Sequence, residues 1–480
     1  MKVLLIEPNI NSYALLPTIS LTALKGFINT KTRHHATILD LVFHKKDWQQ
    51  VTLNEIKKEQ PDLIGFSVLS FNYREALLIA RFIKQHYPTT IIFGGVHAIL
   101  SPDEVIHHHE VDMVCIGEGE EPLKDLLDRA LQANDIEGIW YKVKGKVVKN
   151  KQRTLMRNLD VLGFPDFEDF DLKKYFFINH GHLPIMASRG CPYACSYCSN
   201  HVLKKTLKGH YVRFRSVEHV MEEIDLRIQQ YYGKGLRFLY FFDDTFILDK
   251  EYILKFCKQF VAKGYHRMVG WNVNVRANLV TDELMEAMKE AGCYQVRMGM
   301  ESGNEYIRNK VYHRDMTNQQ IYDAFSIIHK NGLQLRLYFI VGAPYETVQM
   351  MQESLDMAKK SSADEIFFGV LYPLPCTEIQ KVCKQEQVIE LSGDDDSYQY
   401  GTAPVERTKY VSHARLLLFN KKIKHWQMKE YLTDGLKLHG PLFFIDCLSF
   451  LLYYRMRYDL EMNQMLRWNV QKYKLHRLLS

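Results

Sequence analysis

The sequence predicts an α/β protein with a doubly wound parallel sheet, then a partial (β/α)6 barrel, then a helical C-terminal region. Strand and helix patterns alternate through the first third of the chain, a second block holds six such units, and the remainder has a helical pattern. A chain of 480 residues also exceeds one ordinary domain. We expect domains at 1–140 and 183–390, a connector at 141–182 and a helical domain at 391–480.

Short apolar strands separated by amphipathic helices define the first domain. The clearest helix pattern is Tyr73–His86. Because strands that alternate with helices form a parallel, Rossmann-like sheet, ligands are expected at the carboxyl ends of the strands. G-x-G-x-x-G is absent after the first strand, which argues against a nicotinamide site. The expected strands are Val3–Ile6, Ala36–Val42, Leu63–Ser67, Thr90–Phe93 and Met113–Ile116.

A basic, hairpin-like stretch at Tyr141–Lys151 opens the connector. In the second block, long helix patterns such as Val217–Tyr231 separate the strands. Six units suit a partial, TIM-like barrel better than a second open sheet, although periodicity alone does not separate the two. The expected strands are Pro184–Ala187, Phe238–Phe242, Gly270–Val275, Gln295–Met300, Leu335–Val341 and Glu365–Leu371.

The cysteine content and the distribution of charge indicate where the protein works and what it contacts. Nine cysteines, odd in number and clustered only at 191–198, argue for a reducing cytoplasm rather than a disulfide framework. The net charge of +6 lies in the tail, because residues 401–480 hold 14 Lys/Arg and 6 Asp/Glu. A solvated helical face is the first interpretation of this basic, aromatic tail. Peripheral contact with an anionic membrane or an acidic substrate is the second, and nucleic acid is not expected.

The most informative motif is C-x3-C-x2-C, formed by Cys191, Cys195 and Cys198. A [4Fe-4S] cluster normally takes four cysteines, so three thiolates leave one iron open to a substrate. Structural zinc is the alternative, with His201 as its one local fourth ligand. The C-x2-C-x2-H spacing that results is unusual for zinc. We therefore interpret the motif as a cluster site on the rim where barrel enzymes carry their chemistry.

This motif resembles the signature of the radical S-adenosylmethionine (SAM) enzymes, in which the open iron chelates SAM. Later segments extend the resemblance to the branch with an N-terminal cobalamin-binding domain. It implies that polar residues at the ends of the barrel strands, together with an aromatic residue in the motif, contact SAM. An acidic pair that caps a helix is the alternative for residues 243–244. The expected SAM residues are Tyr197, Asp243, Asp244, Asn274, Arg276 and Glu301, with Asn272 beside them.

The first domain resembles the cobalamin-binding domain of that branch. A glycine pair would let the flat ligand lie on the backbone. The D-x-H-x-x-G motif is missing, so cobalt would have no lower ligand or a weak one. His97 is expected to pack on the corrin edge, and a domain that binds nothing is the alternative. The expected cobalamin residues are Asn9, Ser67, Gly94, Gly95, Gly117 and Glu118.

The resemblance implies a cytoplasmic, cobalamin-dependent radical SAM enzyme. Its [4Fe-4S] cluster would cleave SAM to a 5′-deoxyadenosyl radical, most simply for methyl transfer from cobalamin to an unactivated carbon. Oxidative cyclisation or rearrangement is the alternative activity, and a cofactor sensor without turnover is a further one. The expected partners are a small-molecule or lipid-like substrate and an electron donor such as flavodoxin or ferredoxin. In the last barrel loop Cys376 replaces the glycine that family members usually carry.

Overall fold

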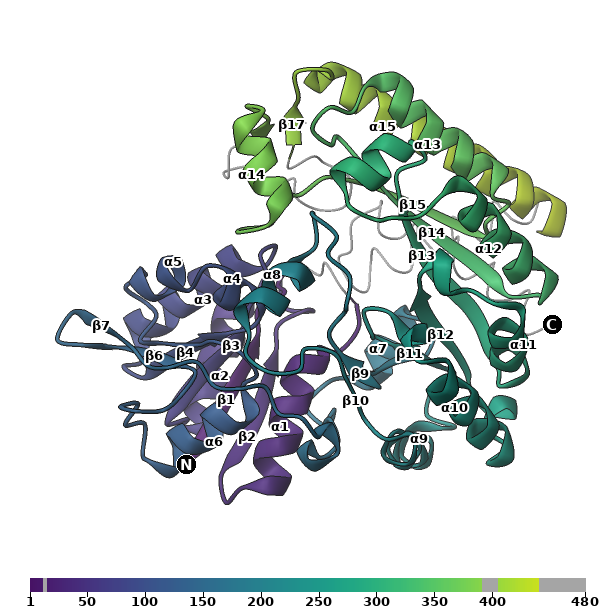
Figure 1. Ribbon diagram of the computed structural model, residues 1–480. Coiled ribbons are helices and arrows are strands. Elements are labelled where there is room, and N and C mark those ends of the chain that lie inside the picture. The colour runs from purple at the N-terminus through teal and green to yellow at the C-terminus, as the bar shows by residue number, and fades with distance from the viewer. Residues whose placement is uncertain (12–14, 391–404, 440–480) are drawn as a thin grey trace.

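The computed structural model describes residues 1–11, 15–390 and 405–439. Two α/β units make up most of this part of the chain (Figure 1). The purple-to-blue unit contains a seven-stranded sheet, and the teal-to-green unit contains a six-stranded sheet. The predicted α/β class is therefore confirmed in both blocks.

The first sheet has the order β2-β1-β3-β4-β5-β6-β7. Strands β1 to β5 pair in parallel, whereas β6 and β7 pair antiparallel. The hairpin that we expected in the connector thus extends this sheet. Its strands are β1 (Lys2–Glu7), β2 (His35–Asp40), β3 (Leu63–Ser67), β4 (Thr90–Gly94), β5 (Met113–Cys115), β6 (Ile139–Val143) and β7 (Lys146–Lys149).

Helices cover both faces of this sheet. Val3 and Leu5 of β1 pack in one apolar core, and Leu4 and Ile6 pack in another, because successive side chains point to opposite faces. Helices α1 and α6 contribute to the first core, and α2 to α5 contribute to the second. The helices are α1 (Ile19–Lys31), α2 (Trp48–Glu59), α3 (Tyr73–His86), α4 (Val96–Leu100), α5 (Pro102–His107) and α6 (Glu120–Asp128).

The second sheet is the wall of a partial barrel. Its order, β15-β14-β13-β12-β11-β8, follows the chain, and all of its pairs are parallel. Strictly sequential parallel strands curve toward closure, as the six expected units predicted. The strands are β8 (His182–Ile185), β11 (Phe238–Phe241), β12 (Gly270–Val275), β13 (Cys293–Glu301), β14 (Gln334–Val341) and β15 (Glu365–Val370).

Helices pack on the outer side of this barrel. Leu335 and Leu337 of β14 are fully buried against them, whereas Arg336 and Tyr338 on the opposite face are only partly buried. One face of the sheet is thus apolar and the other is polar and aromatic. The helices are α9 (Val217–Tyr231), α10 (Lys250–Ala262), α11 (Asp282–Glu290), α12 (Asn318–Lys330) and α13 (Val348–Lys360).

Shorter elements join these units. They are α7 (Leu172–Ile178), β9 (Ser188–Arg189), α8 (Ser199–Thr206), β10 (Arg213–Phe214), α14 (Glu378–Gln385), β16 (Ile389–Glu390), β17 (Val405–Arg407), and the short turns η1 (Leu159–Leu162), η2 (Phe246–Leu248), η3 (Tyr265–Arg267), η4 (Ala277–Leu279) and η5 (Ile307–Val311).

The C-terminal helix α15 (His413–His439) runs along the outside of the barrel unit (Figure 1). Phe419 and Ile423 pack in the barrel core, and Lys422 Nζ donates to Gln352 Oε1 at 2.6 Å. The basic run 421–424 therefore lies on a helix with one buried side. The second basic run, 455–457, lies outside the described residues, as does most of the expected C-terminal domain. No helix in the described ranges is long and apolar enough to cross a membrane.

Candidate active site

The three motif cysteines lie on the loop between β9 and α8, beyond the carboxyl end of β8. This loop is anchored to the segment after β13. Ser196 donates its backbone N–H to the Tyr312 carbonyl at 3.1 Å and its hydroxyl to the Val311 carbonyl at 2.5 Å. Within the loop, the Cys198 N–H donates to the Cys195 carbonyl at 3.1 Å. Backbone contacts thus fix where the thiols lie.

Each thiol has a polar neighbour from a different part of the barrel. Arg276 and Arg314 place their Nη1 atoms 3.8 Å and 3.7 Å from Cys195 Sγ. Thr245 Oγ1 lies 3.8 Å from Cys191 Sγ, and Asn200 Nδ2 lies 3.7 Å from Cys198 Sγ. Hydrogen bonds to sulfur and nearby positive charge tune the reduction potential of iron–sulfur clusters. The surroundings of the three sulfurs therefore suit a cluster.

The chemistry of the thiols also fits a multi-iron cluster. Cys191, Cys195 and Cys198 are free, and burial raises the pKa of Cys198 to about 12, so a bound cation is needed to hold its thiolate. Across residues 1–11, 15–390 and 405–439, no three His, Cys, Asp or Glu side chains gather to hold one metal ion. In a cluster each cysteine binds a different iron. The expected alternative ligand, His201, instead places Nδ1 2.6 Å from the Cys198 carbonyl oxygen.

A hydrogen bond joins the phenol of Tyr197, on the cysteine loop, to the carboxylate of Glu301. The Tyr197 hydroxyl donates to Glu301 Oε1 at 2.9 Å, and Arg314 Nη1 donates to the same hydroxyl at 3.3 Å. Burial raises the pKa of Glu301, while Arg314, Tyr197 and Arg276 oppose that rise. Glu301 has a φ of +65°, an unusual conformation for a residue with a side chain. Such strain concentrates at functional sites, and Glu301 ends β13 beside the cysteines.

Gly299 makes room for this arrangement. A Cβ at Gly299 would lie 2.1 Å from Glu301 Oε1 and 3.3 Å from Arg314 Nη2. Arg314 Nη2 also donates to the Gly299 carbonyl. The glycine in the G-x-E pattern is therefore explained by the space that the carboxylate and the guanidinium occupy.

The expected acidic pair separates into two environments. Asp243 is buried, and its carboxylate accepts from the Ala187 N–H at 3.1 Å and from the Ser188 hydroxyl at 2.5 Å. It thus holds the segment that leads to the cysteines. The Asp244 side chain is exposed, although desolvation raises the pKa of its carboxyl against a hydrogen bond with Asn200. Asn274 Nδ2 donates to the Asp243 carbonyl at 3.0 Å.

Glu118, expected among the cobalamin residues, faces the barrel unit instead. Its Oε1 accepts from Arg189 Nη1 at 2.9 Å and from Arg213 Nη2 at 2.8 Å, and its Oε2 accepts from Arg213 Nη1 at 2.9 Å. Glu120 accepts from Arg189 Nη2 at 2.7 Å. Both oxygens of Glu118 are therefore occupied. Because Arg189 directly precedes the cysteine loop, these ion pairs join the first unit to that loop.

The glycine pair at the end of β4 has two different explanations. A Cβ at Gly95 would lie 2.7 Å from the Val68 backbone N, and Gly95 has a φ of +90°. Close backbone packing therefore requires this glycine, whatever lies on the outer side. A Cβ at Gly94 would make only ordinary contacts, with Cys115 Cβ at 3.6 Å as the nearest. Gly95 thus has a structural reason of its own, and the contact of both glycines with a flat ligand stays a prediction.

The remaining expected cobalamin residues lie near the carboxyl ends of neighbouring strands. Asn9 follows β1, Ser67 ends β3 and Gly117 follows β5. The Ser67 and Ser20 hydroxyl oxygens lie 3.1 Å apart, and Asn9 is buried. These positions share one edge of the sheet, where doubly wound domains bind ligands.

Comparisons with known proteins match both units. A model of the radical SAM superfamily matches residues 185–358, and a model of the B12 binding domain matches residues 9–127. The chain combines a B12-binding domain with a radical SAM domain. The first match includes all three motif cysteines, and the second includes the edge of the first sheet described above.

Relatives and a solved structure share this organisation. The chain is 29% identical over 391 residues to the "Uncharacterized methyltransferase PH0819" of Pyrococcus horikoshii, covering 79% of this chain and 82% of that protein. It is 23% identical to the anaerobic magnesium-protoporphyrin IX monomethyl ester cyclase of Rubrivivax gelatinosus, covering 87% and 75%. It shares the fold of the radical SAM methyltransferase TsrM from Kitasatospora setae, with a TM-score of 0.66, 17% identity and coverage of 85% and 81%.

Histidines of the B12-binding unit take structural positions. The His97 ring is buried and packs on Tyr73, with ring centroids 4.0 Å apart, and its Nδ1 lies 2.9 Å from the Ser70 hydroxyl. Burial lowers the pKa of His97 to about 4, so the ring is neutral near pH 7. His107 closes α5 with Nδ1 2.5 Å from the Asp103 carbonyl oxygen.

Cys376 connects the two units of this radical SAM enzyme. It adopts a φ of +62°, the left-handed region that favours glycine, and its Sγ lies 3.1 Å from the Leu100 carbonyl oxygen at the end of α4. Cys376 thus stands where family members usually carry glycine, yet its backbone keeps a conformation that favours glycine. The loop after β15 therefore touches the B12-binding unit.

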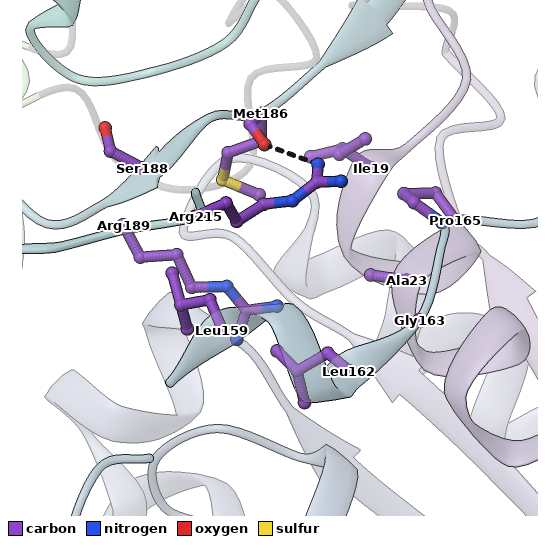
Figure 2. A pocket seen from close by; sticks show the side chains of 10 residues that line it. All are labelled: Ile19, Ala23, Leu159, Leu162, Gly163, Pro165, Met186, Ser188, Arg189 and Arg215. Carbon is purple, nitrogen blue, oxygen red and sulfur yellow. Dashed lines mark hydrogen bonds between the residues drawn. The ribbon is translucent and has the colours of Figure 1, made fainter. Parts of the chain in front are cut away.

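A small, open hollow lies on the seam between α1, η1 and the β8–β9 segment (Figure 2). Both arginines that line it already have partners. Arg215 Nη1 donates to the Met186 carbonyl at 2.9 Å, as Figure 2 shows, and also donates to Glu223. Arg189 is paired with the two glutamates of the B12-binding unit. We therefore regard this hollow as part of the junction rather than as a ligand site.

Sequence reasoning missed Arg314, which lies outside every motif we recognised. Its guanidinium contacts Cys195, Tyr197 and Gly299. Arg314 follows η5 and lies 119 residues from Cys195 in the chain, so only the fold brings them together. A cation between two residues with left-handed backbone, His313 and Asp315, is not recognisable as a site residue from sequence alone.

Proposed function

We propose that this enzyme cleaves SAM reductively and uses the 5′-deoxyadenosyl radical for methyl transfer to an unactivated carbon. This proposal rests on the position of the cysteine loop at the barrel rim. Arg189, directly before that loop, forms ion pairs with Glu118 and Glu120 of the B12-binding unit. When bound, the [4Fe-4S] cluster supplies the electron for SAM cleavage and cobalamin carries the methyl group. The two cofactors would then lie on either side of one junction.

Cys191, Cys195 and Cys198 would hold the cluster as thiolates. Arg276 and Arg314 place two positive charges beside Cys195 and offer N–H donors to its sulfur. Arg276 is itself fixed by stacking on the Tyr193 ring, 3.8 Å from its centroid. These groups therefore maintain both the charge and the orientation of the ligand set.

Asp244 and Glu301 would bind SAM directly. Asp244 offers an accessible carboxylate next to Cys191 for the amino group of SAM, and Glu301 offers an acceptor for its ribose hydroxyls. Tyr197, Asn274 and Arg276 complete the proposed SAM set. Asp243 would support the SAM site without touching SAM, because its carboxylate already accepts hydrogen bonds from the Ala187–Ser188 segment.

Asn9, Ser67, Gly94 and Gly117 would contact cobalamin from the carboxyl edge of the first sheet. This proposal is supported by their common edge and by the B12-binding match over residues 9–127. Gly95 and Glu118 would shape and orient that edge. Their own contacts are with Val68 and with the arginines of the barrel unit.

Oxidative cyclisation is the second candidate, because the similarity to the magnesium-protoporphyrin ester cyclase spans 87% of this chain. Both activities begin with SAM cleavage, and they differ in the second product. Methyl transfer consumes a further SAM and forms S-adenosylhomocysteine, whereas cyclisation does not. A sensor without turnover would form neither product.

The test is anaerobic purification with cobalamin supplied, followed by mass spectrometry of SAM products with cell extract as the substrate source. We expect 5′-deoxyadenosine and S-adenosylhomocysteine together. Cys198→Ala should lose cluster iron and both products, whereas Cys257→Ala, a buried cysteine on α10, should keep them. 5′-Deoxyadenosine without S-adenosylhomocysteine would select cyclisation. The absence of both from fully loaded protein would contradict the proposal.

The proposed reaction also suggests the cellular compartment and the partners of the enzyme. We propose a reducing cytoplasm, since the thiols must stay reduced, and a low-potential donor such as flavodoxin or ferredoxin. The basic run on α15 supports a proposal of peripheral contact with an anionic surface. Domain boundaries at 1–140, 141–182, 183–390 and 391–480 remain our proposal, with β6 and β7 assigned to the first sheet.

A further inference from the structure

The inner face of the barrel carries an unusual layer of arginine and aromatic side chains. Alternate residues of a strand share one face, so Gln295, Arg297 and Gly299 of β13 lie together. Val296 and Met298, on the other face, are fully buried in the apolar core. Arg297 pairs in register with Asn274 on one side and Arg336 on the other. Two arginines therefore meet in the middle of the sheet.

Only one of these two arginines is neutralised within the described residues. Arg336 Nη2 pairs with Glu365 Oε2 at 2.6 Å. Glu365 Oε1 also accepts from Gln295 Nε2 at 3.2 Å. Arg297 instead stacks on the Tyr240 ring, 4.0 Å from its centroid, and donates Nε–H to Gln295 Oε1 at 3.1 Å. In the part of the chain that the structure describes, Arg297 forms no ion pair with a carboxylate.

A group of buried polar and aromatic side chains lies below this layer. The buried His182 ring places Nε2 2.6 Å from the Tyr294 hydroxyl, and Asn272 Nδ2 donates to the same hydroxyl at 2.7 Å. His182 also stacks on Phe238, with centroids 4.8 Å apart. Asn272 Oδ1 is buried without a hydrogen-bond partner among the described residues, and the Nη groups of Arg297 above it likewise donate no hydrogen bond there.

The active-site rim lies above the layer. Gly299 is two residues beyond Arg297 on the same face, a rise of about 6.6 Å along the strand. The Gly299 carbonyl accepts from Arg314 Nη2, and Gly299 lies against Glu301, a proposed SAM residue of the rim. Arg297 is therefore within reach of a small molecule that extends from the rim into the barrel.

Aromatic rings surround this space. Tyr240 lies on β11 and Phe242 directly follows it, with ring centroids 4.9 Å apart, and Phe242 is 46% exposed although its side chain is large and apolar. Tyr338 packs on Phe367 from the other side, with centroids 5.9 Å apart. Together these rings offer an apolar surface of the kind that lines small-molecule sites.

We propose that Arg297 binds an anionic group of the substrate, a carboxylate or a phosphate, while Phe242, Tyr240 and Tyr338 contact its apolar or planar part. Among the described residues no carboxylate lies at ion-pair distance from Arg297, because the nearby Glu365 already pairs with Arg336, and an anionic ligand would supply that missing partner. The planar fork of arginine suits both anions. This inference deepens the proposed function, because it names the substrate class of that same site.

The test compares anions with neutral analogues on the anaerobically reconstituted enzyme. Isothermal titration would measure 1-naphthoate and 1-naphthyl phosphate against 1-naphthamide. We expect at least one anion to bind about tenfold more tightly than the amide, as a charge-assisted hydrogen bond predicts. The stronger anion distinguishes carboxylate from phosphate. Equal binding of all three compounds would overturn the inference.

Variants assign the preference to its residue. Arg297→Gln should abolish the difference between anion and amide, and Arg297→Lys should keep part of it. Arg267→Gln, an exposed arginine on η3, should keep all of it. Phe242→Ala should weaken anion and amide alike. An unchanged preference in Arg297→Gln would overturn the assignment.

A measurement on the wild-type enzyme covers the case in which Arg297→Gln does not fold. Phenylglyoxal should modify Arg297, as read by peptide mass spectrometry, and the preferred anion should protect it while 1-naphthamide should not. Equal protection by both compounds would contradict the inference. SAM cleavage by the same preparation separates the two proposals. Cleavage without anion preference refutes only the anion site, and anion preference without cleavage refutes only the proposed reaction.

Discussion

The Tyr197 hydroxyl donates a hydrogen bond to Glu301 Oε1 at 2.9 Å and so joins the cysteine loop to the end of β13. Tyr197→Phe removes this bond without changing the ring that packs edge-on against Tyr312. Because one hydrogen bond contributes about 0.5–1.5 kcal/mol, we expect SAM affinity to fall about three- to tenfold with the cluster iron retained. Equilibrium dialysis with labelled SAM and an iron assay check this. Tyr322→Phe, on exposed α12, is the control.

The two neighbouring aspartates should respond differently to substitution. Asp244→Asn removes the accessible charge proposed to bind the SAM amino group, so SAM affinity should fall by about tenfold or more. Glu251→Gln, an exposed acid on α10, should leave SAM affinity unchanged. Unaltered SAM binding in Asp244→Asn would remove this residue from the SAM set.

Asp243→Asn should act on the cysteine loop rather than on SAM. The Asp243 carboxylate accepts from the Ser188 hydroxyl and the Ala187 N–H, so Ser188→Ala should reproduce part of the effect. Both variants should lower the iron bound per chain, measured after the same anaerobic reconstitution. If Asp243→Asn weakens SAM binding at full iron content while Ser188→Ala does not, Asp243 contacts SAM directly.

The ion pairs between the two units should contribute to their association. Glu118→Gln leaves Arg189 and Arg213 with less counter-charge, and we expect unfolding free energy to fall by about 2 kcal/mol. The value lies below that of a fully buried pair, because the Glu118 and Arg189 side chains are 21% and 20% exposed. Urea denaturation and limited proteolysis near the connector measure the loss. Glu121→Gln, more exposed and 3.7 Å from Arg153, should have little effect.

Glu346 should make stability depend on pH. Burial raises its pKa from 4.5 to about 8, against the two backbone N–H groups of Gly342 and Ala343 that stabilise its charge. The folded state then binds more protons than the unfolded state between these values, so the Glu346 contribution is lost as pH rises through about 8. Glu346→Gln should match wild type near the lower value and exceed its stability above the upper one. Urea titrations across this range test it, with exposed Asp356→Asn as the control.

Regular strand patterns made the barrel predictable. The predicted range of β12, Gly270–Val275, is the observed one, and the other barrel strands agree within two residues at each end. Several barrel strands alternate buried apolar residues with polar or aromatic ones, and sequence reveals this period of two directly. The hairpin at Tyr141–Lys151 was recognised as a hairpin, but its pairing with β5 depends on a distant edge that local pattern does not encode.

Side-chain partners were less predictable than strands. The residue type of Glu118 suits a ligand contact as well as an ion pair, and its partner Arg189 lies 71 residues away. Asp243 and Asp244 are adjacent, and the geometry of the strand end decides which of them turns inward. For the same reason Gly95 resembled a ligand surface in sequence, whereas in the fold it accommodates the Val68 backbone.

The contact of Glu118 and Glu120 with Arg189 also bears on how such enzymes can be recombined. A B12-binding unit transplanted from a relative would meet Arg189 and Arg213 at its new boundary. Without acids at both positions, the graft would place two uncompensated cations next to the cysteine loop. The two acids and the two arginines therefore have to match across the junction. A chimera that exchanges all four side chains together should keep its interface intact.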